Sequence, residues 1–223
     1  MSILVLNGPS WFWGIDVIFA LVFSLVTILI TLMSHKAYKI TEEPKYKFFS
    51  LSFLLISLSS LVFAIFNSIL IFHLSDKVNL ILSAFDFAFL IQVFLSLLAY
   101  MILIIIVFKI KDTKVVTLLL SLLLLFIVFS HQYTLKYHLT SLVLLAFLAY
   151  QFYLNFQEKK NKNTRLVFTS FYLLACAEIF YIINIFTTEY LYVVGQLVQL
   201  LGFLVLFYMF MRVLHYGGEK RKA

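Results

Sequence analysis

Residues 171–184, FYLLACAEIFYIIN, place a single carboxylate, Glu178, in the middle of a long apolar segment. A charged side chain at the centre of a bilayer costs roughly 2.5 to 3.5 kcal/mol on insertion scales. Holding a glutamate protonated at pH 7 costs roughly 3.7 kcal/mol, so the charge state stays open. The nearest candidate cations in the sequence are His73, Lys77, His131, Lys136 and His138. Glu178 is expected either to be neutral and hydrogen-bonded or to face a cavity that supplies water or a cation.

Most of the other strongly polar residues within the apolar segments fall in the same half of the bilayer as Glu178. The candidate ligand-binding residues are Asp16, Asn67, Asp86, Gln92, Glu178, Asn184, Gln196 and Gln199. At about 1.5 Å per helical residue, Glu178 lies about 13 Å below the nearer end of its segment. Small and polar residues also recur at helical spacing along one face, as from Asp16 through Ser24 to Thr31. Two interpretations follow: packing seams with interhelical hydrogen bonds, or a polar pocket open to the outside.

Residues typical of catalysis or metal binding are not grouped in this way. The five histidines are expected at segment ends or in connections, and no close His pair of the kind used for zinc occurs. Cys176 is the only cysteine, which excludes an internal disulfide, and it points to a different helical face from Glu178. The six glycines form no phosphate-binding loop. The sequence therefore predicts no enzyme, no cofactor and no metal site.

The composition is typical of a protein that faces lipid. Hydrophobic residues make up 64% of the 223 residues and charged residues only 12%, with a mean hydropathy of +1.06. Soluble chains carry roughly 25% charged residues, and a soluble fold of this size has too little interior for so much apolar surface. We therefore expect an integral membrane protein, with the bilayer as its principal partner and the plasma membrane as its location.

Seven apolar segments predict seven transmembrane helices in a single domain, residues 1–223. A span needs about 20 apolar residues. The segments lie at about 11–34, 48–73, 79–108, 115–130, 137–156, 165–187 and 190–214, and the fourth is the shortest. The predicted fold is an all-α, polytopic seven-helix bundle.

The basic residues predict how this bundle is oriented. Of the 17 Lys and Arg residues, 15 fall in alternate connections and in the C-terminal tail, on one side of the bundle. Positive residues favour the cytoplasmic side. This predicts an outer N-terminus and a cytoplasmic C-terminus, and it explains the net charge of +7 without a nucleic-acid partner.

Two segments contain similar stretches. Residues 53–67, FLLISLSSLVFAIFN, and residues 171–184 share Phe, Ile and Asn when Asn67 is aligned with Asn184. These matches favour a 3+1+3 plan, in which two parallel three-helix repeats are joined by the plain fourth helix. The plan resembles that of SWEET and PQ-loop transporters and, more loosely, of seven-helix receptors and microbial sensor modules. The Pro-Gln motif of those transporters is absent, because Pro9 and Pro44 do not precede Gln.

These features predict a non-enzymatic, sensor- or receptor-like membrane protein with an outward-facing polar pocket. A small molecule or ion would bind from outside, and signalling would need a separate cytoplasmic or membrane protein partner. One alternative is a small secondary transporter of the 3+1+3 kind, with Glu178 coupling transport to protons or cations. The other is an accessory subunit of a membrane complex, in which the polar residues serve packing.

Overall fold

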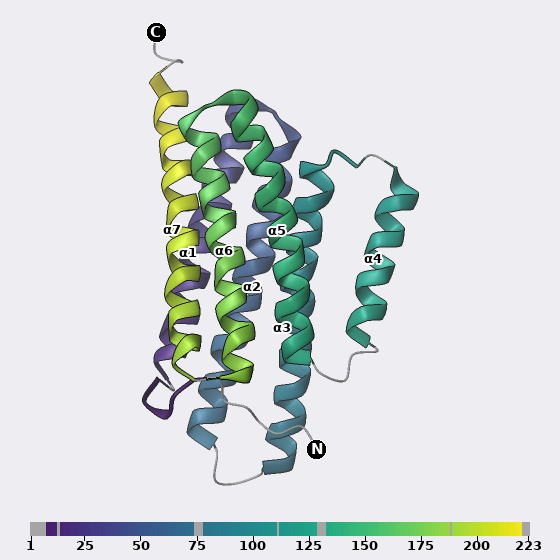
Figure 1. The fold of residues 1–223 in the computed structure, drawn as a ribbon, viewed down its shortest axis with the longest axis vertical. Helices are drawn as coiled ribbons and strands as arrows, with labels where there is room; N and C mark the ends of the chain where they lie inside the picture. Colours follow the sequence, from purple (N-terminus) through teal and green to yellow (C-terminus); the bar gives the residue numbers. More distant parts are fainter. Residues whose placement is uncertain are drawn as a thin grey trace.

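The structure, a computed structural model, describes residues 8–12, 14–73, 78–110, 112–128, 133–187 and 189–219. These residues form a short 3-10 helix, Ser10–Phe12, and seven α-helices, and they contain no strand (Figure 1). The helices are α1 (Ile15–Thr41), α2 (Pro44–His73), α3 (Val78–Val107), α4 (Thr113–Val128), α5 (Tyr133–Lys159), α6 (Lys162–Phe186) and α7 (Tyr190–Glu219).

Six of the seven helices are long and apolar enough to cross a bilayer, namely α1, α2, α3, α5, α6 and α7. For the described residues, this confirms the prediction of an all-helical fold in which several helices are long and apolar enough to cross a membrane. The described part of the predicted fourth span, residues 115–130, lies in α4, which has 16 residues; residues 129–130 are outside the described part of the chain. Because a span needs about 20 residues, α4 is too short to cross a bilayer of ordinary thickness without help from its flanks.

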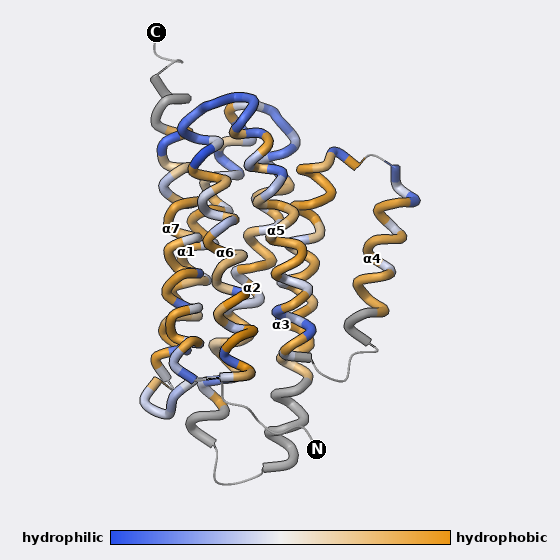
Figure 2. The backbone as a smooth tube through the Cα atoms, viewed as in Figure 1, coloured by the Kyte–Doolittle hydropathy of each residue, from blue (hydrophilic) through white to orange (hydrophobic). Residues whose placement is uncertain are grey.

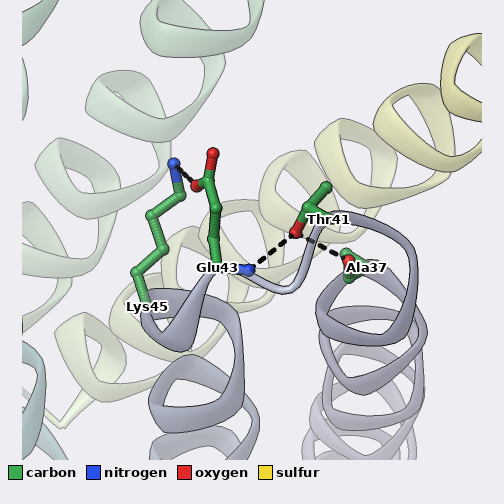
Figure 3. Close-up of polar contacts among 4 residues, drawn as sticks. All are labelled: Ala37, Thr41, Glu43 and Lys45. Carbon is green, nitrogen blue, oxygen red and sulfur yellow. Dashed lines mark hydrogen bonds and ion pairs between the residues drawn. The ribbon is translucent and has the colours of Figure 1, made fainter.

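The helices begin and end close to the predicted segments, but several continue into the polar connections. α1 runs to Thr41 instead of residue 34, since Lys and Ala in its last turns are good helix formers. It ends where Glu42 adopts a left-handed conformation with φ 57°, two residues before Pro44. In the turn to α2, the Thr41 hydroxyl donates to the Ala37 carbonyl and accepts from the Glu43 N–H (Figure 3).

Six helices close into a ring, and α4 lies outside it (Figure 1). Around the ring, α1 packs on α2, α2 on α3, α3 on α5, α5 on α6, α6 on α7, and α7 on α1. α4 packs chiefly against α3, and most of its described leucines are exposed, including Leu118, Leu122, Leu124 and Leu125. Figure 2 shows that the hydrophilic residues gather at the end of the ring that carries the α1–α2 and α5–α6 connections.

Toward that hydrophilic end, apolar side chains fill the interior of the ring. Each ring helix contributes at least one fully buried residue, namely Ile30, Phe53, Leu103, Leu148, Phe171 and Leu206. We refer to these six residues as the apolar plug. The buried carboxyl and amide side chains, Asp16, Asn67, Glu178 and Gln196, lie in the other half of the bundle.

Small residues form close seams between the ring helices. The hydroxyls of Ser24 and Ser57 lie 2.9 Å apart between α1 and α2. Between α6 and α7, the Ser170 hydroxyl donates to the Gly202 carbonyl over 2.8 Å. A Cβ on Gly202 would lie 2.9 Å from Leu174 Cδ2 and 3.3 Å from the Ser170 carbonyl oxygen. The absence of a side chain at Gly202 therefore allows the two helices to approach this closely.

Replacing Gly202 with Val is expected to lower stability, because the added side chain must push α6 away from α7. Overpacking of this kind costs roughly 1–3 kcal/mol. Thermal unfolding of the detergent-solubilised protein measures the loss as a lower apparent melting temperature. Leu201→Val is the matched control, since Leu201 is an exposed neighbour on the same helix. Equal melting temperatures for the two variants would contradict the close approach.

Candidate functional site

The polar half of the ring contains a cavity of about 80 Å³. All six ring helices line it, through Ala20, Phe23, Ile56, Ser59, Ser60, Phe63, Phe89, Gln92, Ser96, Tyr100, Tyr137, His138, Glu178, Tyr181, Tyr192, Gln196 and Gln199. This volume has room for a few water molecules or one small ligand. The lining combines a single acidic residue with amides, hydroxyls and aromatic rings, and it contains no Lys or Arg among the described residues.

At the cavity wall, Glu178 is paired with His138. The carboxylate Oε2 lies 2.7 Å from His138 Nδ1, and the two side chains are only 3% and 12% exposed. The contact joins α6 to α5 and gives the buried carboxylate a hydrogen-bond partner. With its proton on Nδ1, a neutral His138 donates to Glu178 and keeps Nε2 as an acceptor; a protonated ring donates from both nitrogens.

Two tyrosines flank the His138 ring. The centroids of Tyr137 and Tyr181 each lie 4.9 Å from that of the imidazole. Tyr181 also donates from its hydroxyl to Gln199 Oε1 over 2.7 Å, linking α6 to α7. Its ring packs directly on Gly195, where a Cβ would lie 2.6 Å from Tyr181 Cε1. The imidazole is therefore held in place by its neighbours on both sides.

Gln196 leaves one polar atom available to the cavity. Its Nε2 donates to the Tyr192 hydroxyl over 2.9 Å, but its buried Oε1 has no hydrogen-bond partner. A buried amide oxygen without a partner is uncommon and is expected to meet a water molecule or a ligand. On the opposite wall, the Ser59 hydroxyl lies 2.7 Å from the Ser96 hydroxyl and donates to the Gln92 carbonyl.

Four of the eight candidate residues from the sequence line this cavity: Gln92, Glu178, Gln196 and Gln199. Asp16 and Asn67 instead form a separate buried pair, in which Asn67 Nδ2 donates to Asp16 Oδ2 over 3.2 Å. Asp16 Oδ1 also accepts from the backbone N–H groups of Gly14 and Val17, so this side chain secures the start of α1. The side chain of Asp86 lies outside the described part of the structure.

Asn184 likewise lies outside the cavity lining. Its Oδ1 accepts from the backbone N–H of Tyr192 over 2.9 Å. The first N–H groups of a helix have no partner within the helix, so Asn184 satisfies one such group at the start of α7. This bond ties the end of α6 to the next helix, which is a structural role.

The cavity also contains residues that the sequence did not single out as a site. His138 was expected at the outer end of its span, but α5 begins at Tyr133, so His138 lies more than one turn inside the helix. The helix is longer at this end than the predicted segment, because residues 133–136 continue it. The lining tyrosines were also missed: Tyr100, Tyr137, Tyr181 and Tyr192. A tyrosine within an apolar segment needs a partner for its hydroxyl, and this signal was present in the sequence.

Replacing His138 or Glu178 with Leu should destabilise the protein, because each single change leaves a buried polar group without its partner. The double replacement should lower the free energy of unfolding by about 1–2 kcal/mol less than the sum of the two single replacements. Interhelical hydrogen bonds in membranes average about 0.6 kcal/mol in such cycles, and the larger value is expected here because a hydrogen bond to a carboxylate is stronger than one between neutral groups. Titration with a denaturing detergent measures the free energy of unfolding of the wild type, the two single variants and the double variant. The same cycle with Ala at Ser24 and Ser57 is the control for an uncharged pair. Additive losses of stability at His138 and Glu178 would contradict the coupling.

Together these contacts make a small, preorganised chamber with one carboxylate, one imidazole, a free amide oxygen and several aromatic faces. It can bind a small ligand or water and exchange a proton with it. The described residues contain no group of three His, Cys, Asp or Glu side chains that could hold a metal ion. Comparisons with family models, curated proteins and solved structures find no match for this chain, so its function is inferred from this cavity.

Proposed function

We propose that this protein is a non-enzymatic, receptor-like membrane sensor whose ligand occupies the cavity beside Glu178 and His138. The observation that carries the proposal is the composition of the lining, which draws on all six ring helices. A ligand there contacts every helix of the ring, so binding favours one arrangement of the six over others. A separate membrane or cytoplasmic protein would recognise that arrangement of the helices by binding to it.

The chemistry of the lining favours a small cation or a small neutral hydrogen-bonding molecule. Glu178 is the only acidic group and no described basic side chain other than His138 lines the cavity. Aromatic faces, such as those of Tyr100 and Tyr181, attract cations within about 6 Å of the ring centre. The unpartnered Gln196 Oε1 would accept a hydrogen bond from such a ligand.

We place the protein in the plasma membrane, and the distribution of its basic residues supports an outer N-terminus and a cytoplasmic C-terminus. The exposed lysines Lys36, Lys39, Lys47 and Lys159 lie at the hydrophilic end of the ring. With that end in the cytoplasm, the cavity lies in the outer half of the bundle. The apolar plug then separates it from the cytoplasmic side.

A second candidate function is secondary transport of the 3+1+3 kind, with Glu178 as the coupling group. The neighbour pattern favours it: in α1–α3 and in α5–α7, the first helix packs on the second and the second on the third. The third helix of each set packs on the first helix of the other, and α4 connects the two sets. Two parallel repeats would produce this arrangement. The apolar plug argues against transport, because a substrate needs a path through it.

The proposed orientation is tested with two exposed glutamates. In a Cys176→Ala background, Glu189→Cys should react with a membrane-impermeant maleimide added to intact cells. Glu158→Cys should react only after the membrane is permeabilised, since it lies at the opposite end of the bundle. Both side chains are exposed, so burial does not distinguish them. The reverse labelling pattern would invert the proposed topology.

Access to the cavity is tested with two buried positions on α7, again in the Cys176→Ala background. Gln196 lines the cavity and Leu206 belongs to the apolar plug. For a receptor, a small trimethylammonium methanethiosulfonate added outside should modify Gln196→Cys and leave Leu206→Cys unmodified, as mass spectrometry will show. Modification of both would favour a transporter, which exposes its core as it alternates. Modification of neither would mean that the polar groups serve packing, as in an accessory subunit.

A further inference from the structure

A second hollow lies at the hydrophilic end of the ring, far from the cavity. It is a groove of about 810 Å³ formed by α1, the first turn of α6 and the last turns of α7. Three basic residues line it, one from each helix: Lys36, Lys162 and Arg212. No Asp or Glu lines it among the residues that the structure describes.

The remaining walls of the groove are amphipathic. Tyr208 and Met211 come from α7 and Met33 from α1, one turn or less from the basic residues. Tyr208 and Met211 are exposed, and so is Leu32 on α1. Tyrosine is enriched where a helix leaves the hydrocarbon layer. The groove thus has cations at the level of the lipid headgroups and an apolar surface on the side of the acyl chains.

We propose that this groove binds the headgroup of an anionic phospholipid, with the acyl chains along the exposed apolar faces of α1 and α7. The volume is within the range of about 300–1,000 Å³ that ligand sites occupy. Basic pockets between membrane helices on the cytoplasmic side suit anionic headgroups. Charge complementarity and the apolar wall together select a lipid over a water-soluble anion.

One acidic residue at the same end of the ring is already paired elsewhere. Glu43, in the α1–α2 connection, forms an ion pair with Lys45 in the same turn (Figure 3). That pair is local to the connection, and neither residue lines the groove. Lys36 and Lys162 are exposed, so both can reach a phosphate.

Native mass spectrometry of protein released from nanodiscs containing phosphatidylglycerol and phosphatidylcholine tests the proposal. The wild-type protein should retain phosphatidylglycerol in preference to phosphatidylcholine. One basic residue near an anionic headgroup strengthens binding about fivefold. The triple variant Lys36→Gln, Lys162→Gln, Arg212→Gln should therefore retain phosphatidylglycerol about 100-fold more weakly than the wild type. The control variant Lys39→Gln, Lys47→Gln, Lys159→Gln removes three exposed cations at the same end that do not line the groove and should behave as wild type.

Three results would overturn the proposal. Equal retention by the wild type and the groove variant would show that the three cations do not hold the lipid. An equal loss in the control variant would show a general surface attraction instead of a site. Displacement of the lipid by inorganic phosphate would show a site for a free anion.

A second measurement does not depend on the folding of the groove variant. With Trp11 and Trp13 changed to Phe, Tyr208→Trp should be quenched more strongly by brominated phosphatidylglycerol than by brominated phosphatidylcholine. Tyr153→Trp, at an exposed tyrosine on α5, is the matched control and should show no preference between the two lipids. Equal quenching of Tyr208→Trp by the two lipids would overturn the proposal.

Discussion

A polar group inside a bilayer has no water to bond, so it must find its partner within the protein. This constraint explains most of the contacts in the ring. Asp16 bonds to Asn67 and to the backbone at the start of α1, and Asn184 satisfies a backbone N–H at the start of α7. Serine hydroxyls bond across the seams between helices. Glu178, a buried carboxylate well inside α6, has His138 as its partner.

The same constraint separates two kinds of polar residue in the bundle. One kind fixes helix ends, as the Asp16–Asn67 pair and Asn184 do, and so has less capacity left for a ligand. The other kind faces the cavity, where a carboxylate, an imidazole and an amide oxygen have bonding capacity that their neighbours do not exhaust. This difference in spare bonding capacity, more than polarity itself, is what makes the cavity a candidate site and the Asp16–Asn67 pair a structural one.

The cavity and the basic groove use the same helices at different heights. Glu178 and Lys162 are both on α6, and Gln196 and Arg212 are both on α7. The apolar plug lies between the two levels, and close-packed interiors transmit strain. An arrangement of α6 and α7 favoured by a ligand in the cavity would therefore also reach the groove, where a lipid or a partner protein meets the same two helices.

The sequence by itself determined the helical class and the positions of the helices, because long apolar segments and helix-forming flanks act locally. It also identified Glu178 as unusual and named Gln92, Gln196 and Gln199 as candidate site residues beside it. Only the tertiary structure decided which side chains and which helices contact one another. It selected His138 from five candidate cations, put α4 outside the ring and divided the eight candidate residues between a cavity and helix-end bonds. Depth along a helix can be counted from the sequence, but the direction in which each helix faces depends on how six helices pack around a common centre.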